Sequence, residues 1–158
     1  MRRITLRVAC VQLRARPLPE SAAALDDVVR GIRMAAARGA HIAVFPECSY
    51  PGYVLLRKDP YRSHDQPEAA LRAVRRVAAR EGVAVALGIA RYDGGGRLRN
   101  EAVFIDRRGA EVARYAKFFL WNFDGAWFER GRTVEPFETE FGRLGMMICA
   151  DGRMPEIA

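Results

Sequence analysis

Two segments of helical periodicity, each closed by a glycine, constrain the fold of this chain most strongly. Apolar residues recur at helical spacing from Ser21 to Arg38, and Gly39 then ends the segment. The same pattern returns over Pro67–Arg80 and ends at Gly82. Glycine commonly terminates a helix because it adopts the left-handed conformation without steric cost. The sequence therefore predicts two helices that each bury one face.

Short apolar runs flank these helices and predict strands. They are rich in β-branched and small residues and are separated by turns such as Asp93–Gly96. Helices among such strands predict an α/β fold, in which a mixed β-sheet is layered with helices. The predicted strands cover Leu6–Leu13, Ile42–Phe45, Val83–Ala90, Arg99–Ile105, Glu111–Tyr115, Thr133–Thr139 and Leu144–Cys149, and Phe118–Arg132 is predicted to be irregular.

Charge and hydropathy narrow the class of function. The 26 basic residues exceed the 19 acidic ones and give a net charge of +7, which makes nucleic-acid binding one hypothesis. The arginines are scattered among acidic residues, however, and this pattern is typical of solvated helix faces. No apolar run approaches the roughly 18 residues that span a bilayer, and no signal peptide is recognisable. We expect a cytoplasmic protein that binds neither membrane nor nucleic acid.

The cysteines indicate reduced thiols and no metal. The chain has three, Cys10, Cys48 and Cys149, without the paired spacing of a disulfide framework. No CxxC motif or histidine cluster offers a metal site, so no metal is expected.

Cys149 is the candidate nucleophile. It ends an apolar run and precedes Ala150, Asp151 and Gly152, where a strand is predicted to turn into a helix. Backbone N–H groups at such a turn stabilise a thiolate and a developing oxyanion. The alternative is that Cys149 is a small buried hydrophobic residue, which is the usual fate of a free cysteine.

Glu47 and Lys117 are the candidate partners of Cys149. The two histidines of the chain lie in contexts that do not suggest a site, so a carboxylate is the better candidate base. Glu47 directly follows a predicted strand and has apolar neighbours. Lys117 lies in an aromatic stretch, where an unpaired ammonium would be costly. The alternatives are an ordinary loop glutamate and a lysine whose stem covers apolar surface.

Several segments together resemble the nitrilase, or carbon–nitrogen hydrolase, superfamily. They match its first strand, its glutamate segment, the hairpin that leads to its lysine, and its nucleophile turn, in the same order along nearly the whole chain. These segments are Val8–Gln12, Val44–Glu47, Asn100–Val103, Asp106–Gly109, Tyr115–Lys117, Phe141–Gly145 and Ile148–Glu156.

The resemblance implies a fold, a reaction and roles for residues. The fold would be the N-terminal part of a four-layer α-β-β-α sandwich, with residues 1–158 forming a domain that is incomplete at its C-terminus. The reaction would be hydrolysis of a non-peptide C–N bond, in a small amide or N-carbamoyl substrate, without a cofactor. Glu47 would be the general base and Cys149 the nucleophile, while Lys117 and the Ala150 N–H would hold the oxyanion. The resemblance also implies a homo-oligomer in the full-length protein.

Other positions leave alternatives open. Where the superfamily often has a second glutamate, this chain has Asp124, and Glu129 is the alternative for that supporting role. Tyr53, Trp121 and Trp127 are candidate substrate contacts, or else packing residues of the core. Nitrile hydrolysis and a non-catalytic binding or assembly module of the same fold are the competing functions. Finally, Asp151 and Arg153 are predicted to form an ion pair that shapes the nucleophile turn.

Overall fold

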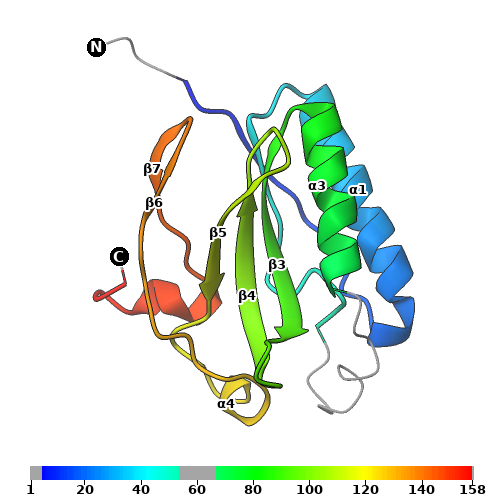
Figure 1. The fold of residues 1–158 in the computed structure, drawn as a ribbon. Coiled ribbons are helices and arrows are strands. Elements are labelled where there is room, and N and C mark those ends of the chain that lie inside the picture. The colour runs from blue at the N-terminus through cyan, green and yellow to red at the C-terminus, as the bar shows by residue number, and fades with distance from the viewer. Residues whose placement is uncertain (1–4, 54–66, 158) are drawn as a thin grey trace.

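A five-stranded mixed sheet is the centre of the computed structural model, which describes residues 5–53 and 67–157 (Figure 1). The strand order is β1-β2-β3-β4-β5, so that neighbours in sequence are neighbours in space. The first three strands run parallel, and the last two pair antiparallel. The strands are β1 (Val8–Cys10), β2 (Ile42–Val44), β3 (Ala84–Tyr92), β4 (Leu98–Ile105) and β5 (Glu111–Ala116).

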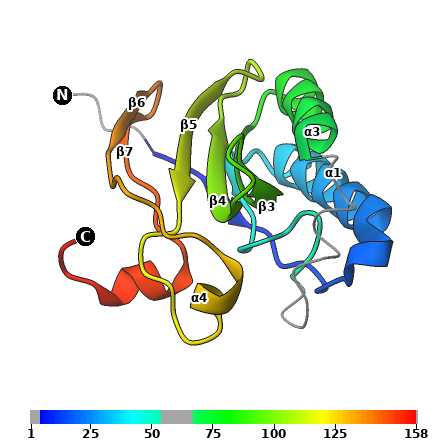
Figure 2. The ribbon, with the colours of Figure 1, turned by 60° about the horizontal axis from the view of Figure 1, so that its bottom comes forward.

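Helices α1 (Ser21–Ala37) and α3 (Pro67–Glu81) cover one face of this sheet (Figure 2). Their apolar stripes meet the side chains that alternate along β3 and β4, and the main core lies between them. Full burial of such a side chain stabilises the fold by roughly 1.5–3 kcal/mol. Core residues that are at most 1% exposed include Val28, Ile32, Leu71, Val74, Val85, Leu87, Ile89 and Val103.

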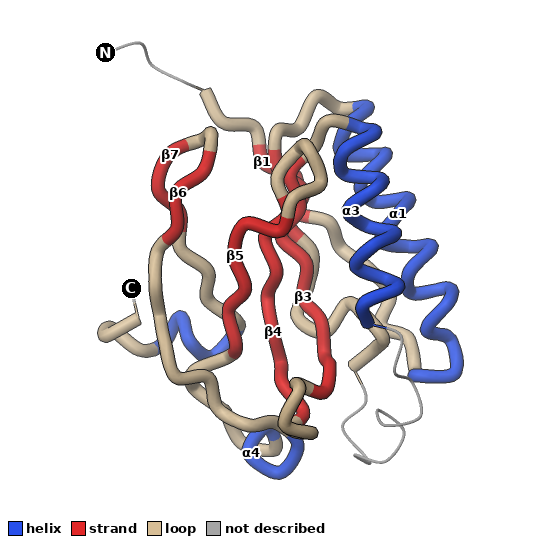
Figure 3. Tube along the Cα trace, in the orientation of Figure 1, coloured by secondary structure: helices blue, strands red, loops and turns tan. Residues whose placement is uncertain are grey.

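A two-stranded hairpin lies on the opposite face of the sheet (Figure 3). It is formed by β6 (Phe137–Thr139) and β7 (Gly142–Leu144). Phe137 packs on Phe104 of β4 with their ring centroids 5.2 Å apart. The hairpin leads into a 3₁₀ turn, η2 (Cys149–Arg153), which lies near the end of β5 in Figure 1. A further short helix, α4 (Asp124–Trp127), follows β5.

The mixed α/β architecture predicted from the sequence is confirmed, as are both helices to within a residue at each end. The strand predicted over Leu144–Cys149 is wrong beyond Leu144. Exposure still alternates from Leu144 to Ile148, as in an extended chain, but the residues after Leu144 meet no ladder partner within the described ranges. Alternating hydrophobic residues indicate only that the backbone is extended. A strand also requires a neighbouring backbone with which it forms hydrogen bonds. The irregular stretch predicted over Phe118–Arg132 contains α4, which was not foreseen.

Among residues 5–53 and 67–157, no helix has the length and apolar character needed to cross a membrane.

Candidate active site

Glu47 projects from a segment that leaves the end of β2 and crosses β3. The Tyr50 N–H donates to the Gly88 carbonyl of β3 at 3.3 Å and holds the segment against that strand. The approach is so close that a Cβ at Gly88 would lie 2.2 Å from the Pro46 carbonyl oxygen and 2.8 Å from the Cys48 nitrogen. Only glycine fits under this backbone, so Gly88 fixes the point from which Glu47 extends.

A methyl group at Gly88 is therefore expected to disturb both stability and the site. We expect Gly88→Ala to lower the free energy of unfolding by about 1–3 kcal/mol, because the contacts are with backbone that cannot rotate away. Urea unfolding measures the change. Gly94→Ala is the control: no atom lies within 4 Å of a Cβ there, and a change of no more than about 0.5 kcal/mol is expected. Equal effects of the two substitutions would contradict the close approach.

Lys117 links the Glu47 segment to the loop after β5. The residue is 1% exposed, and its Nζ donates to Glu47 Oε1 at 2.7 Å and to Asp124 Oδ2 at 2.6 Å. Burial lowers the pKa of the ammonium, but the hydrogen bonds to Asp124 and then to Glu47 outweigh it, and the pKa is raised above its usual value. Lys117 therefore stays charged at neutral pH, and two of its three N–H donors have acceptors within the described residues.

Asp124 is the carboxylate that completes this buried cluster. It opens α4, is 4% exposed, and also accepts a hydrogen bond from the Trp121 N–H at 3.1 Å. The other candidate, Glu129, is exposed. The structure thus brings Glu47, Lys117 and Asp124 together in one chain of ion pairs.

Cys149 begins η2 in a left-handed conformation, with φ of 49°. Such a conformation is unfavourable for a residue with a side chain and occurs mainly at turns and functional sites. The side chain is exposed. Ala150 follows as a buried residue, and its N–H belongs to the first turn, where helical N–H groups have no partner within the helix.

Asp151 holds the turn that presents Cys149. It is 0% exposed and accepts hydrogen bonds from the Ile148 N–H (2.9 Å), the Tyr115 hydroxyl (2.7 Å) and the Phe119 N–H (2.6 Å). Burial, and then the bond to Asp151, raise the pKa of Tyr115 well above its usual value, so this hydroxyl stays a donor. The nucleophile turn is thereby tied to the residues on either side of Lys117.

The predicted ion pair between Asp151 and Arg153 is wrong, because the Asp151 oxygens accept hydrogen bonds from the three donors just described. The Arg153 guanidinium lies instead over the Trp121 ring, 4.8 Å from its centroid. The shaping role predicted for Asp151 remains, with different partners.

Cys149 borders two cavities that also reach the other candidate catalytic residues. One, of about 500 Å³, lies against the apolar face of the sheet and includes Glu47 in its lining. The other, of about 180 Å³, is lined by Lys117, Asp124 and the aromatic residues named next. Cys149 therefore lines both the cavity that Glu47 reaches and the cavity that Lys117 reaches.

The aromatic candidates divide into two groups. Tyr53 and Trp121 line the smaller cavity together with Phe123. Burial, followed by the charges of Glu47 and Asp124, raises the pKa of Tyr53, so its hydroxyl stays protonated at neutral pH. Trp127, the third candidate, does not line either of these cavities.

Trp127 packs instead in a core cluster and is 9% exposed. This corrects its assignment as a substrate contact in favour of the packing alternative. An aromatic residue at the end of a helix has the same sequence pattern in either role, and only the direction of the side chain separates the two. Its partners are Leu18, Cys48, Ala90, Leu98 and Phe128.

Sequence reasoning missed Asn100, which donates from Nδ2 to Glu47 Oε1 at 2.6 Å. Its position in a predicted strand gave no sign that it would be buried beside a carboxylate. Asn100 lies between Arg99 and Glu101, in a segment that resembles the superfamily, but neither signal identified Glu47 as its partner.

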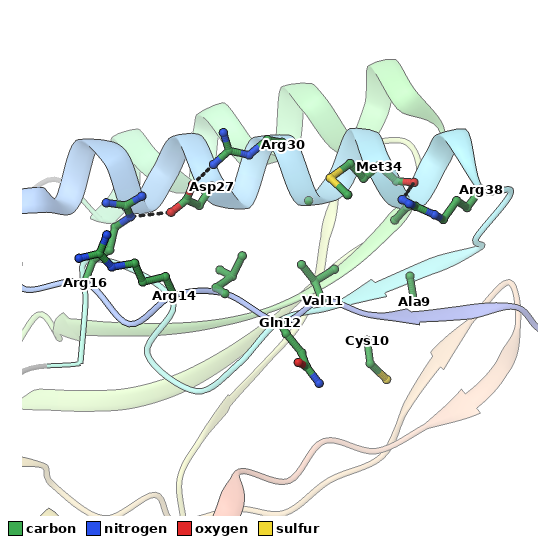
Figure 4. A pocket seen from close by; sticks show the side chains of 13 residues that line it. Ala9, Cys10, Val11, Gln12, Arg14, Arg16, Asp27, Arg30, Met34 and Arg38 are labelled. Atoms are coloured by element: carbon green, nitrogen blue, oxygen red, sulfur yellow. Dashed lines mark hydrogen bonds and ion pairs between the residues drawn. The ribbon is translucent and has the colours of Figure 1, made fainter.

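A separate cavity of about 560 Å³ lies between β1 and α1 (Figure 4). Arg16 and Arg30 both pair with Asp27 on its wall, while Cys10 and Gln12 point away from α1. None of Glu47, Lys117 and Cys149 lines it, so it is distinct from the candidate active site. No group of three or more potential metal ligands occurs among the described residues, at either place.

Comparison with known proteins gives consistent matches. The family model for carbon–nitrogen hydrolases matches residues 7–158. An omega-amidase of Homo sapiens is 28% identical over 166 residues, which cover 98% of this chain and 58% of the human protein. A nitrilase of Pyrococcus abyssi is 32% identical over 131 residues, which cover 80% of this chain and 49% of the nitrilase. The chain thus spans about half the length of these relatives.

Solved structures show the same fold. An amidase from Nesterenkonia sp. superimposes with a TM-score of 0.86 at 27% identity, covering 96% of this chain and 58% of the amidase. Variants of that amidase carry acrylamide, or the acetamide moiety of fluoroacetamide, on the active site cysteine. Another variant, with that cysteine replaced by alanine, is in complex with butyramide.

Proposed function

The chain belongs to the carbon–nitrogen hydrolase family, and from this premise we propose that it hydrolyses a small amide or N-carbamoyl compound through a cysteine acyl-enzyme. The proposal rests on the part-buried contact of 2.7 Å between Lys117 Nζ and Glu47 Oε1. Glu47 lines one cavity and Lys117 lines another, and Cys149 borders both. Acid, ammonium and sulfur are the three groups that such a mechanism needs.

In the proposed reaction, Glu47 takes the thiol proton as the Cys149 sulfur attacks the carbonyl carbon. A C–S bond forms, and the carbonyl π electrons move to oxygen. Glu47 then gives the proton to the departing nitrogen as the C–N bond breaks, which leaves a thioester. Water, deprotonated by Glu47, attacks this thioester and releases the acid and the free thiol. No cofactor is needed, because each step is a proton transfer or an addition–elimination at carbon.

Lys117 is assigned the oxyanion. Two of its donors hold Glu47 and Asp124, and the third, which has no acceptor among the described residues, would meet the developing negative charge together with the Ala150 N–H. Because the pKa of Lys117 is raised, the ammonium neither loses its proton nor competes with Glu47 as the base. Charge stabilisation and proton transfer thus belong to different residues.

Small amides are the proposed substrates. The cavity that joins Cys149 to Lys117 measures about 180 Å³ and has Tyr53 and Trp121 on its wall, which suits a short acyl group. A cysteine-to-alanine variant of the Nesterenkonia amidase is in complex with butyramide, an amide of this size class. A nitrile is the second candidate, supported by the similarity to the Pyrococcus nitrilase.

The function is tested by measuring ammonia release from butyramide and other short amides, N-carbamoyl amino acids, and nitriles. We expect turnover of at least one amide or N-carbamoyl compound. Turnover of nitriles alone would favour the second candidate. A folded protein that releases no ammonia from any of these compounds would support the non-catalytic alternative and overturn the proposal.

Glu47→Gln is expected to lower kcat by about 10³-fold, because proton transfer by a positioned group contributes roughly 10²–10⁴-fold. Mass spectrometry should still find an acrylamide adduct on Cys149, as in the glutamine variant of the Nesterenkonia amidase, since addition does not require turnover. Glu129→Gln, at the exposed alternative position, is the matched control and should keep wild-type activity. If Glu47→Gln lowers kcat by tenfold or less, Glu47 is not the general base.

A further inference from the structure

Asn100 has a buried polar atom with no hydrogen-bond partner in the described part of the chain. The residue lies on β4 and is 1% exposed. Its Oδ1 has no hydrogen-bond partner within residues 5–53 and 67–157. Leaving such an atom unpaired destabilises a fold, so the position calls for an explanation beyond packing.

The other end of the same amide contacts the proposed base. Asn100 Nδ2 donates to Glu47 Oε1 at 2.6 Å, the oxygen that also accepts from Lys117 Nζ at 2.7 Å. The Asn100 carbonyl accepts from the Lys117 N–H at 2.8 Å, so one residue contacts both catalytic candidates. In the described part of the chain, no hydrogen bond reaches Glu47 Oε2.

We propose that Asn100 is a positioning residue for the general base: with Lys117 it holds Oε1 of Glu47, so that Oε2 is the oxygen that exchanges the proton with Cys149. The inference rests on the proposed function. An amide is suited to the task because it donates without ever transferring its proton. It can therefore hold Oε1 while Oε2 alternates between its charged and protonated forms.

The chemistry of alternative side chains supports asparagine at this place. Leucine has a similar size but no donor, and aspartate would put a second carboxylate against Glu47. The amide presents its N–H toward Glu47, which leaves its Oδ1 without a hydrogen bond in the described part of the chain. This arrangement is unfavourable, and a packing role alone would not require it.

The groups that face Glu47 set the background for a pH test. Lys117 contacts it directly, and Asp124 lies on the far side of Lys117. Tyr53 and Cys48 are close enough that the charge of Glu47 contributes to the raised pKa of each, after burial. Cys149 borders the same cavity as Glu47.

The test compares Asn100→Leu and Asn100→Asp with the wild-type protein. We expect Asn100→Leu to lower kcat by about 10- to 100-fold with KM changed by no more than about threefold, because a hydrogen bond to a charged group is lost. The acidic limb of the kcat/KM profile should move to higher pH, since the anionic carboxylate loses a donor. Asn100→Asp should move it further, through repulsion between like charges.

The control is Glu101→Gln, on the same strand. Glu101 is 4% exposed and pairs with Arg91 and Arg114, away from Glu47. This substitution should lower stability without moving the acidic limb. If Asn100→Leu keeps the wild-type limb and loses less than threefold in kcat, Asn100 has only a structural role and the proposal is wrong.

A second measurement does not depend on the folding of Asn100 variants. The chain has two asparagines, so selective ¹⁵N labelling resolves the side-chain amide of buried Asn100 from that of exposed Asn122. We expect a downfield Asn100 amide proton that moves upfield in Glu47→Gln while Asn122 stays in place. If the chemical shift of the Asn100 amide proton does not change in Glu47→Gln, the proposal is wrong. Failure of the proposed function is read separately, from a wild-type protein that hydrolyses none of the substrates.

Discussion

Cys149→Ala is expected to abolish hydrolysis, lowering kcat by at least about 10⁴-fold. In the proposed reaction the sulfur forms the covalent bond to the substrate, and loss of a nucleophile removes nearly all of the chemistry that depends on it. Stability should not fall, because the side chain is exposed. Ammonia release measures the activity, and urea unfolding confirms that the variant is folded.

The other two cysteines provide matched controls for this prediction. Cys10 is exposed on β1, beside the cavity that none of the catalytic candidates lines. Cys48 is buried, and burial followed by the charge of Glu47 raises the pKa of its thiol far above the usual value, so it is a poor nucleophile. Cys10→Ala should keep full activity. Retention of more than a hundredth of wild-type kcat in Cys149→Ala, or an equal loss in Cys10→Ala, would rule out Cys149 as the nucleophile.

Lys117→Met is expected to lower the free energy of unfolding by roughly 3–5 kcal/mol, since removing one partner of a buried ion pair leaves charge uncompensated. Here two carboxylates, Glu47 and Asp124, would lose their common cation. Methionine is chosen because it is unbranched and fills a similar length. Denaturant unfolding gives the stability, and ammonia release should fall together with it because the proposed oxyanion donor is gone.

A double variant separates charge from packing. Lys117→Met combined with Asp124→Asn should recover part of the stability lost in Lys117→Met, because one unpaired charge is neutralised. Arg108→Met is the surface control: its ion pair with Asp106 involves a side chain that is 87% exposed, and such pairs contribute about 0–1 kcal/mol. If Lys117→Met destabilises no more than Arg108→Met does, the buried cluster is not a structural element of the fold.

Much of the fold could be predicted from the sequence because its signals are local. The helix that ends before Gly39 and the one that ends before Gly82 each combine helical periodicity with a terminating glycine, and both are present. The segment after Leu144 could not be predicted as well. Its alternating pattern is real, but whether an extended segment becomes a strand depends on which backbone lies beside it.

The candidate site also has features that the sequence could predict and features that it could not. A lone lysine amid aromatic residues must find a counter-charge, so Lys117 could be predicted as paired or functional from elementary electrostatics. That its partners are Glu47 and Asp124 depended on the resemblance to a family, because they lie 70 and 7 residues away. The contact of Asn100 with Glu47 had no such guide. The packing of Trp127 could not be separated from pocket lining, since both roles use the same residue type.

The left-handed backbone at Cys149 has a consequence for how such a protein can change over evolutionary time. In the described residues, the non-glycine positions with positive φ are Cys48, Asn122 and Cys149, with values of 48°, 50° and 49°. Each adjoins Glu47 or borders the cavity that joins Lys117 to the sulfur. Glycine would relax the backbone at any of them, yet at Cys149 it would also remove the proposed nucleophile. Under the proposed mechanism, mutations that relieve the backbone strain at this position would therefore abolish catalysis, and only selection for turnover would keep the cysteine there.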